Sequence, residues 1–75
     1  MRELVLDIAK ALVDNPEAVV VEETKENDAI ILKLKVSDDD MGKVIGKQGR
    51  IAKAIRTVVR SAANREKVKV SLEIV

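Results

Sequence analysis

The chain has 75 residues, enough for one small domain and too few for two, with a net charge of +1 and neither cysteine nor histidine. These absences exclude a disulfide scaffold and a zinc site of the usual kind, so a modest apolar core must hold the fold. Charged residues interrupt the apolar run of residues 1–13, and no stretch reaches the length of a membrane span, so we expect a cytoplasmic protein without a membrane segment.

Regularly spaced apolar residues predict a first helix over about residues 2–13. Pro16 follows it, and proline disfavours helical backbone in the residue before it. The valine-rich residues 18–24 and the alternating apolar residues 30–36 then predict two strands. Residues 25–28, Lys-Glu-Asn-Asp, supply turn chemistry between them. We therefore expect a β-hairpin with one face against the core.

Residues 37–40, Ser-Asp-Asp-Asp, predict the start of a second helix that continues through residues 41–45. Serine is a good N-cap, and the aspartates complement the positive end of a helix. Three carboxylates in a row could instead suggest a metal site. Consecutive helical residues point in different directions, so we favour the capping role.

A longer helix is predicted from Arg50 to about Asn64, with an apolar stripe on one side and mostly basic residues on the other. The stripe consists of Ile51, Ile55, Val58, Val59 and Ala62. Residues 68–74 alternate apolar and polar side chains and predict a final strand.

The expected order of elements is αββααβ. The helical crossover between the second and third strands is long enough to allow them to pair in parallel. We therefore expect an α+β fold in which three helices cover one face of a three-stranded mixed sheet.

Charge is distributed unevenly along the chain. Residues 1–40 hold five basic and eleven acidic residues, whereas residues 41–65 hold seven basic residues and no acid. A basic segment of this kind is typical of a surface that binds a polyanion. The alternative is that these residues simply form the solvated side of a helix.

The predicted loop Gly46-Lys47-Gln48-Gly49 between the two helices has a composition suited to phosphate binding. Glycines let a phosphate approach the backbone, and the N-terminus of the next helix offers unpaired N–H groups. A nucleotide-binding P-loop is excluded because Gln48 stands where a hydroxyl must bind magnesium. A nucleic acid backbone, with its phosphates in series, fits the basic helix better. The alternative is that both glycines only cap a helix and form a turn.

The stretch VIGKQGRI, residues 44–51, resembles the (I/V)-I-G-x-x-G-x-x-I signature of KH domains, and the order αββααβ is similar to their type II arrangement. The similarity covers residues 1–75, which we interpret as a single KH domain similar to the small stand-alone bacterial proteins of the KhpA family. The resemblance implies non-catalytic binding of single-stranded RNA through the G-x-x-G loop, without a cofactor, as an RNA chaperone or post-transcriptional regulator. The residues alone leave RNA and single-stranded DNA both open.

The resemblance also implies which residues meet RNA. The clamp would consist of Gly46, Lys47, Gln48 and Gly49. Positive charge would come from Arg50, Lys53 and Lys43. The aliphatic positions of the signature would be matched by Val44 and Ile45. The loop 63–67 and the strand at 68–72 should border the other side of the groove.

A second hypothesis is a protein-interaction module. Ala52, Val59 and Ala63 fall at the edge of the predicted stripe, where small side chains would suit a dimer face. The family resemblance implies a homodimer or a pair with a larger KH-containing RNA-binding protein. Catalysis finds no support, because there is no histidine or cysteine and no hydroxyl residue has an evident base partner.

Overall fold

The computed structural model describes residues 1–46 and 49–75. Its elements follow the predicted αββααβ order, with one short 3-10 helix, η1, added before the first strand. They are α1 (Arg2–Leu12), η1 (Pro16–Ala18), β1 (Val20–Glu26), β2 (Ala29–Lys35), α2 (Asp38–Ile45), α3 (Arg50–Glu66) and β3 (Lys69–Ile74).

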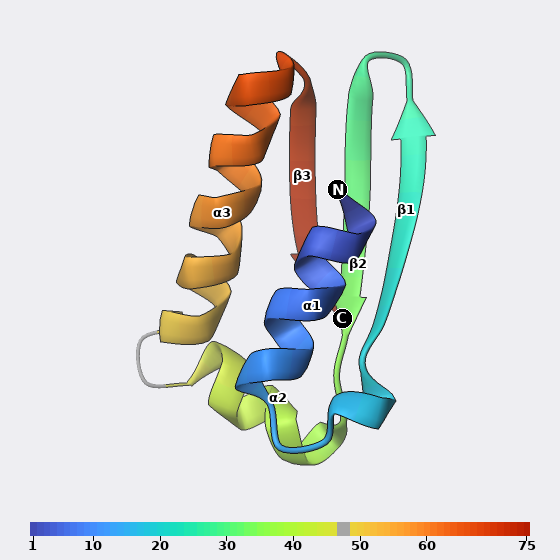
Figure 1. Cartoon of the computed structure of the whole chain (residues 1–75). Helices are drawn as coiled ribbons and strands as arrows, with labels where there is room; N and C mark the ends of the chain where they lie inside the picture. Colours follow the sequence, from blue (N-terminus) through green and yellow to red (C-terminus); the bar gives the residue numbers. More distant parts are fainter. Residues whose placement is uncertain (47–48) are drawn as a thin grey trace.

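The three strands form one mixed sheet in the order β1-β2-β3, which confirms the predicted fold class. β1 and β2 pair antiparallel as a hairpin, and β3 pairs parallel to β2 after the helical crossover. Figure 1 shows α1 and α3 on the same side of the sheet, with α2 beyond the end of β2. Both outer strands are sheet edges, and the edge formed by β3 lies beside α3.

The core lies between these helices and the inner face of the sheet. Val5 of α1, Leu32 and Leu34 of β2 and Ile55 of α3 are fully buried, each with 0% of its surface exposed. The sheet contributes every second residue, because side chains alternate between the two faces of a strand. Leu32 pairs with Leu72 of β3 and therefore continues the apolar layer across the sheet.

The boundaries of the hairpin differ from those predicted. β1 begins at Val20, because Pro16 starts the 3-10 turn η1 and residues 16–18 are not extended. β1 then continues to Glu26, which leaves only Asn27 and Asp28 as the turn. Asn27 adopts a φ of 52°, a conformation that asparagine tolerates better than most residues.

The buried stripe of α3 is rotated from the predicted one. The buried residues are Ala52, Ile55, Val59 and Ala63, whereas the predicted Ile51, Val58 and Ala62 are half-buried. The prediction followed the larger apolar side chains. The helix instead turns Ala52 and Ala63 toward the core, where small side chains allow close packing.

Candidate nucleic-acid interface

The two glycines of the predicted loop are both required by the backbone, for different reasons. Gly46 ends α2, and a Cβ atom on it would collide with the carbonyl group of Gly42. Gly49 precedes α3 with a φ of 66°, which is the left-handed region that favours glycine. The N–H of Gly49 donates to the carbonyl oxygen of Gly46 at 2.8 Å. These features hold the two glycines close together between α2 and α3.

The connection leaves one side of the second glycine open. A Cβ built on Gly49 would meet no atom within 4 Å. The first turn of α3 begins at the next residue, Arg50, which is exposed. Backbone N–H groups of a first helical turn have no partner within the helix and favour an anion. The predicted clamp residues Lys47 and Gln48 lie outside the described residues.

A depression of about 370 Å³ opens next to this connection. Its walls combine apolar and cationic side chains, namely Ile45, Gly49, Ala52, Lys53, Arg56 and Ile74. Ile45 is 55% exposed although it is a large aliphatic residue. The depression therefore offers an apolar surface and two positive charges beside the glycines.

A second depression, of about 480 Å³, continues along α3 and β3. Arg56 lines both depressions, which therefore adjoin each other along α3, and we call the two together the α3–β3 groove. Further lining residues include Arg60 and Asn64 of α3 and Val70 and Leu72 of β3. Residues 63–67 and 68–72 were expected to border a groove. Of these, Ala63, Asn64 and residues 68–72 line it.

Three cations of α3 form one wall of this groove. Lys53, Arg56 and Arg60 are three and four residues apart, which places them on one side of a helix. Of these three cations, only Lys53 was predicted from the sequence as a site residue. The spacing of Arg56 and Arg60 from Lys53 could have placed them on the same side of the helix. It could not show that this side faces a groove, because that depends on the position of β3.

Of the predicted RNA-binding residues that the structure describes, Ile45, Gly49 and Lys53 line the groove, whereas Lys43, Val44, Gly46 and Arg50 do not. Val44 is 1% exposed and belongs to the core, so its side chain supports the site without reaching a ligand. Lys43 points its Nζ atom at Asp14, with 3.2 Å between Nζ and Oδ1. Of the predicted cations near the loop, Arg50 and Lys53 therefore have no ion-pair partner among the residues that the structure describes.

The proposed dimer-face residues also lie elsewhere than expected. Ala52, Val59 and Ala63 are only 3%, 3% and 6% exposed, because the rotated stripe of α3 turns them toward the sheet. They form the floor of the α3–β3 groove. In the single chain, these three residues therefore offer little exposed surface to a second copy.

Comparison with known proteins agrees with the fold. The sequence model of the family described as "KhpA/KhpB, KH domain" matches residues 2–74. The chain belongs to this KH-domain family. It is 65% identical to the RNA-binding protein KhpA of Clostridium perfringens and 63% identical to that of Caldanaerobacter subterraneus, in each case over the full length of both chains. It is 51% identical to KhpA of Chlamydia trachomatis, over 99% of this chain and 95% of that protein. No solved structure gives a significant match.

The KH fold positions the groove partly through one buried carboxylate, Asp40, which is 1% exposed. It accepts the backbone N–H groups of Asp14 and Asn15 at 3.0 and 2.9 Å and the side-chain amide of Asn15 at 3.2 Å. The hydroxyl of Ser37 donates to it at 3.0 Å, while Ser37 caps α2 as predicted. Burial acts to raise the pKa of Asp40, but these hydrogen bonds outweigh it and hold the pKa below its ordinary value.

This network was not predicted. Residues 38–40 were predicted only to complement the first helical turn, whereas Asp40 also ties the segment after α1 to the start of α2. Within residues 1–46 and 49–75, no cluster of three or more candidate ligands could hold a metal ion. In the same part of the KH domain, no helix has the length and apolarity needed to cross a bilayer.

Proposed function

We propose that this KH domain binds single-stranded RNA in the α3–β3 groove without catalysing a reaction. The observation that carries the proposal is a groove that begins at Gly49 and is lined along one wall by Lys53, Arg56 and Arg60. Cations in series match phosphates in series, and phosphate contacts supply most of the affinity of such complexes. The relatives' name, RNA-binding protein KhpA, supports RNA as the ligand.

The phosphates enter where the glycines lie. In the proposed complex, Gly46, Lys47, Gln48 and Gly49 clamp the sugar-phosphate backbone, as G-x-x-G loops do in KH domains. A phosphate can approach Gly49 because its Cβ position is open. Arg50, in the first turn of α3, adds charge beside the helix N-terminus.

The bases lie against aliphatic side chains in this proposal. Ile45 and Ile74 line the groove next to the loop, and Leu72 lines it further along. The chain has no aromatic residue, so stacking terms of roughly 1 to 3 kcal/mol per base are missing. The result is a binder of modest affinity, which suits a role as an RNA chaperone or post-transcriptional regulator in the cytoplasm.

The test is a titration of fluorescent single-stranded RNA, and of DNA of the same sequence, into the wild type and a Lys47→Asp, Gln48→Asp variant. The variant should lose RNA binding and remain folded by circular dichroism, because two acids at the clamp repel phosphate. A Lys10→Asp, Thr24→Asp variant makes the same charge change at two exposed positions outside the groove and is the matched control. Equal binding by all three proteins would contradict the proposal.

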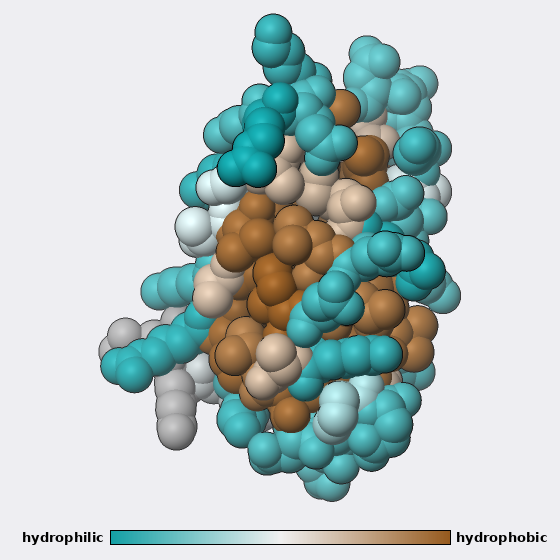
Figure 2. Space-filling view, viewed as in Figure 1, coloured by the Kyte–Doolittle hydropathy of each residue, from teal (hydrophilic) through white to brown (hydrophobic). Residues whose placement is uncertain are grey.

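A second function, association with another chain, is favoured by an apolar surface away from the groove. Leu4 and Leu12 of α1 are 37% and 39% exposed, and Ile8 of α1 and Val58 of α3 are half-buried. Figure 2 shows apolar surface gathered over the face that α1 and α3 present. We propose this face, in place of Ala52, Val59 and Ala63, as the contact in a homodimer or in a pair with a larger KH-containing RNA-binding protein.

A further inference from the structure

A third depression, of about 470 Å³, lies at the end of the molecule opposite the glycine loop. We call it the hairpin-end depression. Five of its lining residues come from the β1–β2 hairpin and three from the start of β3 and the connection before it: Lys25, Asn27, Asp28, Ala29 and Ile30, and Lys67, Val68 and Lys69. Lys67, Val68 and Lys69 belong to segments that were expected to border the groove, whereas none of the hairpin residues was assigned to RNA.

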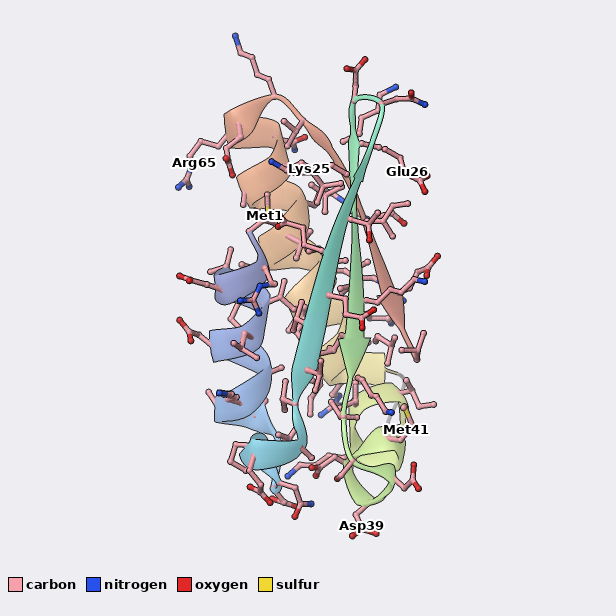
Figure 3. All side chains as sticks on the ribbon, turned by 90° about the vertical axis from the view of Figure 1, so that its right-hand side faces the viewer. Met1, Lys25, Glu26, Asp39, Met41 and Arg65 are labelled. Carbon is pink, nitrogen blue, oxygen red and sulfur yellow. The ribbon has the colours of Figure 1, made fainter. Side chains whose placement is uncertain are left out.

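The arrangement of the strands brings these two segments together. β2 and β3 run parallel, and Ala29 pairs with Lys69, so the hairpin turn and the start of β3 are neighbours. Figure 1 shows the turn and the end of α3 at the same end of the sheet. Figure 3 shows Lys25 leaving β1 toward the side on which α3 lies, whereas Glu26 points to the opposite side.

The depression is basic. Lys25, Lys67 and Lys69 are exposed, and Asp28 is the one carboxylate among its lining residues. In the described part of the chain, the single ion pair joins Lys43 to Asp14, so these three lysines have no carboxylate partner there. Three cations opposed by one acid favour an anionic ligand.

The hairpin-end depression also adjoins the α3–β3 groove. Val68 and Lys69 line both, so the short connection between α3 and β3 is their common wall. The groove begins at the glycine loop and follows α3, which has 17 residues and therefore a length of about 25 Å. A strand held at the loop and running past Arg60 reaches this connection.

We infer that the hairpin-end depression is a second phosphate-binding subsite for the same RNA strand. This inference rests on the proposed function, and it extends the binding surface beyond the clamp. Lys25 and Lys67 contact phosphates of nucleotides that have left the α3–β3 groove. The subsite therefore acts only on strands longer than the clamp itself holds.

The experiment compares two lengths of fluorescent oligouridylate RNA, one of about four nucleotides, the length that a G-x-x-G clamp holds, and one of about ten. They are titrated by anisotropy into the wild type, a Lys25→Gln, Lys67→Gln variant and a Lys33→Gln, Lys35→Gln control. The control removes the same charge from exposed positions of β2 that do not line the depressions.

For the longer RNA, the variant should lose roughly tenfold in affinity, and its log-log salt slope should become about 1.4 shallower, as expected for two lost phosphate contacts. The shorter RNA should bind the wild type and the variant alike, and the control should match the wild type throughout. Equal losses in variant and control, or none in the variant, would overturn the subsite alone. Failure of the wild type to bind either RNA would overturn the proposed function and the subsite together.

Discussion

The carboxylate of Asp40 accepts the backbone N–H of Asn15 at 2.9 Å, across 25 positions of sequence. This bond and that from Asp14 hold the end of α1 against the first turn of α2. α2 is only eight residues long and ends at the first glycine of the loop. The hydrogen bonds at the N-terminal end of α2 therefore help to determine where Gly46, at its other end, lies.

The first prediction concerns pH. The pKa of Asp40 is lower in the folded protein than in the unfolded chain. The stability that its carboxylate contributes is therefore complete at a pH above the unfolded pKa, and it is lost as the pH falls through the folded pKa. We expect the thermal midpoint of the wild type to fall steadily below the ordinary carboxyl value of 3.8. Asp40→Asn should lower the midpoint by several degrees at pH 7 and flatten this acid dependence.

Asp39→Asn is the control, since it changes the exposed neighbour in the same helical turn. Its pH profile should follow that of the wild type. Scanning calorimetry between pH 7 and acid supplies the profiles. An Asp40→Asn protein as stable as the wild type at neutral pH would show that the network contributes nothing.

The second prediction distinguishes the three glycines. Gly46→Ala should destabilise the fold by about 1–3 kcal/mol, because the new methyl group meets backbone of Gly42 that cannot move aside easily. Gly49→Ala should cost about 1–2 kcal/mol because of its left-handed φ. Gly42→Ala should instead stabilise by about 0.5–1 kcal/mol, since it lies inside α2 with free space around its Cβ position. Urea unfolding measures all three, and equal effects would contradict the geometry.

The third prediction concerns the cationic wall. Arg56→Gln with Arg60→Gln should weaken RNA binding roughly tenfold and make the log-log salt slope about 1.4 shallower, because two phosphate contacts are removed. The variant should keep its circular dichroism spectrum, since both side chains are exposed. The Lys33→Gln, Lys35→Gln protein again provides the charge-matched comparison. If neither variant changes the log-log salt slope of RNA binding, the two arginines do not contact phosphates.

The fourth prediction concerns association. If the apolar face of α1 and α3 joins two copies, Leu4→Ser with Leu12→Ser should convert a dimer into a monomer in sedimentation equilibrium. Val20→Ser with Val75→Ser is the matched control, because these residues are 48% and 55% exposed but lie outside α1 and α3. A wild type that sediments as a monomer at high concentration would exclude the homodimer.

Local patterns in the sequence were sufficient to predict the kind and order of the elements, because helices and strands repeat with different periods. Long-range packing was not predictable in the same way. The rotation of α3 depends on how closely Ala52 and Ala63 approach the sheet, and the role of Asp40 depends on a segment 25 residues away. The loop glycines were identified from sequence, whereas the groove needed β3 beside α3.

The four buried residues of α3 have a simple relation to the groove. In the sequence, each buried residue is followed directly by a polar residue that lines the α3–β3 groove. These doublets are Ala52-Lys53, Ile55-Arg56, Val59-Arg60 and Ala63-Asn64. The two members of each doublet differ by one step of the helix, or about 100° of rotation. Substitutions at the second member can therefore change ligand preference while the first preserves the fold. A one-residue insertion early in α3 would turn every later doublet at once, so this helix should tolerate exchange of residues far better than any change in its length.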